Sequence, residues 1–190
     1  LDEDSHGNVW CSTRSLGVFV LSKNKAPLAH FSTANTQGQR IHSNDIFYLF
    51  VDSKDRCWAF SFYKGLAVKE PEDGSFLPVG ESSIFLYGRE LADGRLVFSS
   101  MSGGLYVLDE KGGDYHFEKL GKVGGGAFTN IYQNKKGLLL ASRDQSNIEV
   151  LNPKKGFAPE VSLPIGGDVL CFYEDPASDT LWIGTSNGLV

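Results

Sequence analysis

An internal repeat constrains the fold of this chain more than any other feature. Five segments follow one template: an apolar stretch, an acidic or glycine turn, an apolar pair that often ends in Trp, a short polar loop and a Gly–apolar step. The aligned positions of the apolar pair are spaced by 48, 39, 43 and 42 residues and are Trp10, Trp58, Val97, Leu140 and Trp182. Such a period predicts a repeat architecture, in which each unit buries its apolar face against its neighbours.

Each unit has the pattern of short strands. Its first stretch is apolar almost throughout, as in Ile46–Val51 and Val169–Tyr173, which is typical of a strand buried on both faces. Turns such as Ser5–Asn8 predict tight hairpins, and the Trp position and the Gly–apolar step mark the second and third strands. A fourth, more polar strand follows, for example Tyr115–Leu120. Four short strands per repeat are typical of the blades of a β-propeller.

We therefore predict an all-β fold, a fragment of a β-propeller with four-stranded blades of about 43 residues. The predicted units form one propeller domain and comprise a blade that lacks its innermost strand (1–45), three further blades (46–83, 84–128 and 129–168) and an incomplete blade (169–190). An open stack of blades leaves two sheet faces without a partner. We expect the remaining blades of a larger propeller to cover them, and a homodimer stays open as an alternative.

Charge and hydropathy exclude two classes of partner. The chain has 23 acidic and 18 basic residues, a formal net charge of −5, and no Lys/Arg cluster. This balance argues against nucleic acid or an anionic membrane as the main partner. No apolar run approaches the roughly 20 residues that a membrane helix needs, so we predict no direct membrane insertion.

Three cysteines, Cys11, Cys57 and Cys171, lie far apart and form no recognisable pairing pattern. We expect them to be reduced thiols that pack as small hydrophobic side chains, while a disulfide stays open. Cysteine usage therefore does not fix the cellular compartment.

Two motifs resemble known sites but have simpler explanations. Gly184–Gly188 spells G-x-S-x-G, yet it joins two predicted strands instead of a strand and a helix, so we interpret it as a hairpin loop. Asp2–Gly7 begins like a calcium-binding loop, but its twelfth position is Thr13, where a bidentate Glu is needed. We expect turn and capping roles for this segment and for the related acidic turns at 52–55 and 174–176.

The remaining candidates for chemistry are dispersed. The four histidines fall in different units without the spacing of metal ligands: His6, His30, His42 and His116. Gly124–Gly126 precedes no helix that could bind a phosphate group. We therefore predict that this region is not an enzyme and holds no cofactor and no metal.

One set of loops does suggest a binding face. In a propeller, the loops joining second to third strands and the loops entering each first strand open on the same face. The first set supplies the candidate ligand-binding residues, which are Arg14, Tyr63, Lys64, Met101, Arg143, Asp144 and Asn187. The second set carries further polar residues, which are His42, Asn44, Asp45, Ser82, Ser83, Asn130 and Asp168. Cationic, aromatic and amide groups around one channel suit a polar ligand, and ordinary solvated loops are the alternative.

Several stretches resemble the two-component-regulator propeller repeat. They are Ser43–Ile46 leading to Asp52, and Glu174–Asp175 leading to Leu181–Thr185 and Gly188–Leu189. Such repeats are found mainly in periplasmic sensor regions of bacterial hybrid histidine kinases. The resemblance implies a non-catalytic, periplasmic sensor region of a membrane-anchored protein, with other sensor domains as partners and an oligosaccharide as ligand. Any kinase activity would lie outside the chain. The resemblance carries over no ligand residues, because its recognisable positions are structural.

Two other functions stay open at this stage. The chain is alternatively a structural or protein-interaction propeller unrelated to signalling, or part of a propeller enzyme whose site lies outside these 190 residues. The sequence leaves the identity of the ligand and the total number of blades undetermined.

Overall fold

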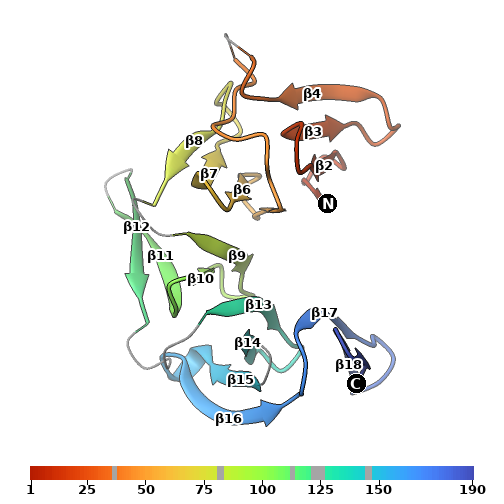
Figure 1. Cartoon of the computed structure of the whole chain (residues 1–190), viewed down its shortest axis with the longest axis vertical. Coiled ribbons are helices and arrows are strands. Elements are labelled where there is room, and N and C mark those ends of the chain that lie inside the picture. Colours follow the sequence, from red (N-terminus) through yellow and green to blue (C-terminus); the bar gives the residue numbers. More distant parts are fainter. Residues whose placement is uncertain (36–37, 81–83, 112–113, 121–126, 144–146) are drawn as a thin grey trace.

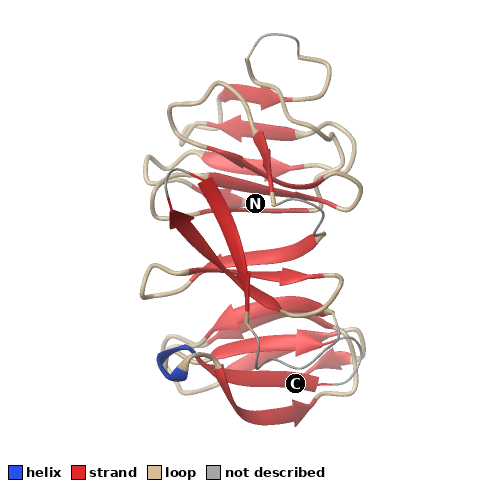
Figure 2. Cartoon of the chain, turned by 90° about the vertical axis from the view of Figure 1, so that its left-hand side faces the viewer, coloured by secondary structure: helices blue, strands red, loops and turns tan. Residues whose placement is uncertain are grey.

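The computed structural model describes residues 1–35, 38–80, 84–111, 114–120, 127–143 and 147–190. These residues form five antiparallel sheets, four of four strands and one of three, each built from strands consecutive in sequence. The sheets follow one another along an open arc, with the chain running from β1 to β19 (Figure 1). Seen from the side, strands dominate and the described part of the chain has a single short helical turn (Figure 2). The prediction of an all-β propeller is confirmed.

The strands of each sheet, called a blade below, have the following bounds. Blade 1 contains β1 (Asp2–Glu3), β2 (Val9–Ser12), β3 (Val18–Leu21) and β4 (Pro27–Phe31). Blade 2 contains β5 (Tyr48–Val51), β6 (Cys57–Ser61), β7 (Gly65–Lys69) and β8 (Leu77–Val79). Blade 3 contains β9 (Phe85–Glu90), β10 (Leu96–Ser100), β11 (Leu105–Lys111) and β12 (Asp114–Lys119). Blade 4 contains β13 (Phe128–Gln133), β14 (Leu139–Arg143), β15 (Asn147–Asn152) and β16 (Ala158–Pro164), with the helical turn Pro153–Lys155 before β16. Blade 5 contains β17 (Val169–Glu174), β18 (Leu181–Thr185) and β19 (Gly188–Leu189).

The blades are arranged radially, with the first strand of each on the inside. The first strands of neighbouring blades contact one another, β1 with β5, β5 with β9, β9 with β13 and β13 with β17. Four apolar clusters fill the spaces between consecutive blades. The core is thus divided into layers, each shared by two sheets, as the repeat predicts.

The aligned apolar position lies in these layers. Trp10 and Trp58 are buried, and Val97 and Leu140 are buried at the same place in blades 3 and 4. Trp182 is 43% exposed, because no blade of the described chain lies against its side of blade 5. The repeat register is therefore correct, and the exposure of Trp182 follows from its position at the end of the arc.

A carboxylate six residues before the Trp explains why the turns are acidic. Asp4 accepts a hydrogen bond from the Trp10 indole N–H at 3.0 Å, and Asp52 accepts one from Trp58 at 2.8 Å. Both carboxylates also accept backbone amides of their own turn. In blade 3 the corresponding residue is Leu91, which packs in the same apolar cluster as Val97. The expected turn and capping role of these acids is confirmed in blades 1 and 2.

The first and last blades differ in completeness. Where the sequence suggests a blade without its innermost strand, Asp2 and Glu3 pair with Trp10 and Val9 and form a two-residue first strand. This short strand is held in place because the Asp2 carboxylate also accepts the Val51 amide of the next blade, at 2.8 Å. Blade 5 has three strands in the described chain.

The cysteines do not share one environment. Cys57 is fully buried between blades 1 and 2, and burial raises the pKa of its thiol well above the usual value. Cys11 is half-buried and Cys171 is exposed, so the expectation of three packed thiols is wrong for Cys171. The reason is the same as for Trp182, because β17 also lies in the uncovered blade 5.

Candidate functional site

The two sets of loops chosen from the sequence do share one face of the arc. The loop after β2 contacts the loop entering β5, since the Gly17 amide donates to the Asn44 carbonyl and the Ile46 amide donates to the Thr13 carbonyl. In blade 3, the Met101 amide donates to the carbonyl of Ile84. These backbone hydrogen bonds hold the loops of this face against one another. We call this surface the upper face.

A cluster of ionic and aromatic side chains joins blades 1 and 2 on the upper face. Arg14 Nε lies 2.7 Å from a carboxylate oxygen of Asp45. The Arg14 guanidinium also lies over the Phe62 ring, 5.5 Å from its centroid, and Phe62 stacks on Phe47 at 4.1 Å. Arg14 and Asp45 were predicted for this face, whereas Phe47 and Phe62 were not, because they are indistinguishable in sequence from core residues. We call these four residues the Arg14 cluster.

Tyr63 and Lys64 extend the Arg14 cluster toward solvent. Both directly follow Phe62 in the loop between β6 and β7, and Tyr63 is 85% exposed. His42 lies below this loop, where burial lowers the pKa of its ring and the Lys64 charge adds to the effect, against an opposing contribution from the backbone of Lys64 and Gly65. The lowered pKa favours the neutral form of His42.

The other predicted residues lie on separate blades. Met101 is exposed in blade 3. Arg143 is half-buried in blade 4, with its Nε 3.7 Å from Glu149 and its guanidinium over the Phe128 ring at 5.2 Å. Asn187 donates to the Gly166 carbonyl at 2.5 Å and so fastens the loop that enters β17. Arg143 and Asn187 therefore have structural contacts of their own.

Arg14 thus contacts Phe62 in the loop that carries Tyr63 and Lys64, whereas Met101, Arg143 and Asn187 lie on other blades. Asp144 lies outside the described residues, as do Ser82, Ser83 and Gly124–Gly126. Within the described ranges, no three His, Cys, Asp or Glu side chains are grouped so that they could hold a metal ion.

A second charged network lies between blades 2 and 3, at the turns of the opposite face. Arg56 is buried and donates through Nε to Asp52 at 2.7 Å and through Nη1 to Glu110 at 2.5 Å. Lys54 also donates to Glu110, at 2.7 Å. Burial opposes the ionisation of Glu110, but the hydrogen bonds from Lys54 and Arg56 outweigh it and hold the pKa of this carboxyl below its usual value. The network links two blades and has the character of a structural ion cluster.

Comparisons with known proteins identify the fold. No protein-family model and no curated protein matches the sequence. Among solved structures, the extracellular domain assigned to the hybrid two component system BT3049 from B. thetaiotaomicron matches with a TM-score of 0.75 at 14% identity, over 98% of this chain and 25% of that chain. The extracellular domain assigned to the one component system BT4673 of the same organism gives 0.74 at 14% identity, over 99% and 26%. The chain is a β-propeller.

The structure of a propeller enzyme is almost as similar to this chain as the two extracellular domains are. The gluconolactonase XC5397 from Xanthomonas campestris matches with a TM-score of 0.73 at 13% identity, over 98% of this chain and 68% of that chain. This propeller spans about a quarter of the length of the two extracellular domains. The similarity therefore establishes the fold, while the activity of any of these proteins has to be tested for this one.

Proposed function

We propose that this propeller is the ligand-recognition part of an extracytoplasmic two-component sensor and has no catalytic activity of its own. The observation that carries the proposal is the upper face, where the Arg14 cluster joins two adjacent blades and the loop that contains Phe62 also carries the exposed Tyr63. The similarity to extracellular domains of two-component systems supports this setting. Propeller loops on one face converge, so residues distant in sequence can contact one ligand.

The chemistry of this face suits an oligosaccharide. A sugar ring has an apolar face that stacks on an aromatic ring, and Tyr63 offers such a ring to solvent. The Arg14 side chain is 65% exposed, so its guanidinium keeps donors for hydroxyl groups while Asp45 fixes its orientation. The Tyr63 ring is thus complementary to the apolar face of a sugar, and the Arg14 guanidinium is complementary to its hydroxyl groups.

The proposed location is the periplasm, with the kinase or other output region outside this chain. Within the described residues there is no helix of the length and apolarity required to cross a membrane. We further propose that additional blades cover blade 5, where the exposed apolar residues include Leu170, Tyr173, Trp182 and Leu189. A homodimer is the alternative cover for this surface.

Calorimetric titration of the intact protein with a panel of oligosaccharides tests the proposal. Tyr63→Ala and Arg14→Ala are each expected to weaken binding about five- to tenfold, since each removes one ligand contact. Lys154→Ala is the matched control, because Lys154 is an exposed cation in the turn on the opposite face. If affinity is unchanged in Tyr63→Ala and Arg14→Ala, the upper face is not the site.

The same protein preparation tests the enzyme alternative. The gluconolactonase among the similar propellers makes lactone hydrolysis the activity to assay. Hydrolysis of glucono-δ-lactone above the uncatalysed rate would contradict a purely recognition role. Binding of a protein partner without any saccharide would instead favour the interaction propeller.

A further inference from the structure

The outer strand of blade 3 differs from the outer strands of the other four-stranded blades. β4, β8 and β16 each contain at least one Pro, whereas β12 contains none. A Pro on an outer strand hinders pairing with a further strand, because it has no backbone N–H to donate. β12 lies at the periphery of its sheet without this protection (Figure 1).

The backbone groups on the free edge of β12 follow from its pairing with β11. Hydrogen-bonded and non-hydrogen-bonded pairs alternate along an antiparallel ladder, and this ladder has no shift in register. The Leu120 amide donates to the Leu105 carbonyl at 2.8 Å, which fixes the phase of the alternation. Three residues of β12 therefore direct their N–H and C=O groups away from β11, namely Tyr115, Phe117 and Lys119. Within the described residues, none of the backbone hydrogen bonds uses these outward groups.

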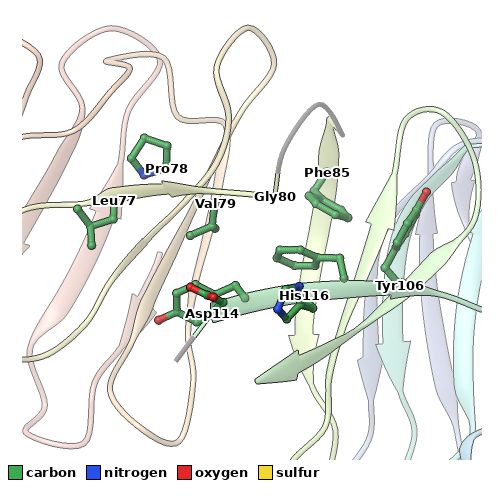
Figure 3. A pocket seen from close by; sticks show the side chains of 10 residues that line it. Leu77, Pro78, Val79, Gly80, Phe85, Tyr106, Asp114 and His116 are labelled. Atoms are coloured by element: carbon green, nitrogen blue, oxygen red, sulfur yellow. The ribbon is translucent and has the colours of Figure 1, made fainter. Parts of the chain in front are cut away.

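A cavity of about 760 Å³ runs along this edge, between blades 2 and 3. Four consecutive residues of β12 (114–117) line it, although successive side chains of a strand point to opposite faces. The cavity therefore borders the edge of β12 and not only one of its faces. Leu77, Pro78 and Val79 of β8 line its other side, where Leu77 is 51% exposed (Figure 3).

The two faces of β12 have different chemistry. Tyr115 and Phe117 point toward blade 2 and pack against the apolar cluster that blade 2 shares with blade 3. Asp114, His116 and Glu118 point the other way and are exposed. Among the described side chains, Asp114 and Glu118 have no ion-pair partner. A strand added beside β12 would therefore meet apolar surface with one row of side chains and two carboxylates with the other.

We propose that β12 binds an extended segment of a partner protein, which adds a strand to blade 3 and alternates apolar with basic residues. The outward N–H and C=O groups supply the main-chain hydrogen bonds, and alternate side chains supply the specificity. The apolar residues of the segment lie on the side of Leu77 and Val79. Its Lys or Arg residues lie opposite Asp114 and Glu118, as oppositely charged cross-strand pairs.

A second copy of this chain is a poorer occupant of the same edge. If two β12 strands paired antiparallel about His116, each Asp114 would lie opposite Glu118 of the other copy. Like charges directly opposite one another destabilise a strand pair. The two acids therefore favour a basic partner and disfavour self-association through β12.

Isothermal titration of the intact protein with three capped pentapeptides tests this proposal. The first is acetyl-Lys-Val-Thr-Val-Lys-amide, the second has Glu in place of both Lys residues, and the third is the first peptide N-methylated at both Val residues. The first peptide is expected to bind saturably and the other two at least about fivefold more weakly, since the second reverses the charges and the third loses two main-chain donors. Equal or tighter binding of either, or no saturable binding of the first, overturns the proposal.

A charge-reversed protein shows whether β12 selects the basic partner. Asp114→Lys combined with Glu118→Lys should reverse the preference, so that the Glu peptide binds at least about fivefold more tightly than the Lys peptide. Glu160→Lys is the matched control, because Glu160 is an exposed acid on β16, the outer strand of blade 4. This control and Arg14→Ala on the upper face should both keep the preference for the Lys peptide. If the double variant still prefers the Lys peptide, the assignment to β12 is wrong.

Amide hydrogen exchange locates the added strand. Saturation with the Lys peptide should slow exchange of the Tyr115 and Phe117 amides at least about tenfold, and should leave the His116 amide, which already faces β11, nearly unchanged. Protection confined to other strands would overturn the proposal. Slow exchange of the Tyr115 and Phe117 amides in the protein alone, increasing with protein concentration, would show that a second copy covers the edge and would also overturn it.

Discussion

Replacing Asp52 by Asn tests whether the buried carboxylate of blade 2 holds its turn and its Trp together. Asp52 Oδ1 accepts the amides of Lys54 and Arg56, both at 3.0 Å. Oδ2 accepts Arg56 Nε at 2.7 Å and the Trp58 indole at 2.8 Å. An Asn can keep the first two bonds, but its amide nitrogen would then face two donors, and the buried Arg56 would lose one of its carboxylate partners.

The expected cost of Asp52→Asn is about 3 kcal/mol, the lower end of the range for breaking a buried ion pair, since Glu110 still neutralises Arg56. Urea unfolding followed by tryptophan fluorescence measures it. Asp93→Asn in blade 3 is the control, since Asp93 also pairs with an Arg in the turn after a first strand, at 2.7 Å, but with both side chains partly exposed. That pair should contribute less than about 1 kcal/mol. Equal losses in the two variants would refute the reasoning.

Three further variants probe the layers between blades. Trp58→Ala should cost about 3–5 kcal/mol because Trp58 is fully buried, whereas the half-exposed Trp182→Ala should cost about 1 kcal/mol; similar losses in denaturant titrations would contradict the layer assignment. Glu110 has a folded-state pKa below its unfolded value, so its stabilisation is present above the unfolded pKa and is lost as pH falls through the folded pKa. Thermal unfolding between about pH 6 and about pH 3 should therefore show a shallower fall for Glu110→Gln, and parallel curves would refute this. Gly88→Ala should cost about 1–3 kcal/mol in urea unfolding, since its Cβ would lie 2.5 Å from the Phe50 ring; an unchanged midpoint would show that these rings can move apart.

The fold could be predicted from the sequence because each blade repeats the same physical requirement. A first strand buried on both faces must be apolar throughout. The aligned position that faces the next blade must hold a large apolar side chain. Both requirements leave strong patterns in the sequence. The acidic turns that precede the Trp positions were visible too, but their contact with Trp was not. Only the structure shows that the carboxylate accepts the indole N–H, and that Leu91 replaces the acid where Val97 replaces the Trp.

The candidate site could be predicted only in part, because loops carry no periodic signal. Sequence position placed Arg14 and Tyr63 in loops of the upper face, since topology alone decides which loops share it. It could not show that Arg143 turns toward Glu149 and Phe128, because side-chain direction in a loop or at a strand end depends on contacts far along the chain.

The position of Trp182 in its blade decides how its exposure should be interpreted. An exposed Trp beside Tyr173 could be taken for a sugar-stacking platform, yet Trp182 occupies the position that in blade 2 holds Trp58 against the next sheet. Leu189, which is also exposed in blade 5, is aliphatic and its side chain offers no hydrogen bonds to a polar ligand. The upper face has the opposite character, because Arg14 and Tyr63 combine charge, hydroxyl and ring within two loops. Blade-packing chemistry therefore explains the surface of blade 5, and the upper face is the surface that we propose for recognition of a polar ligand.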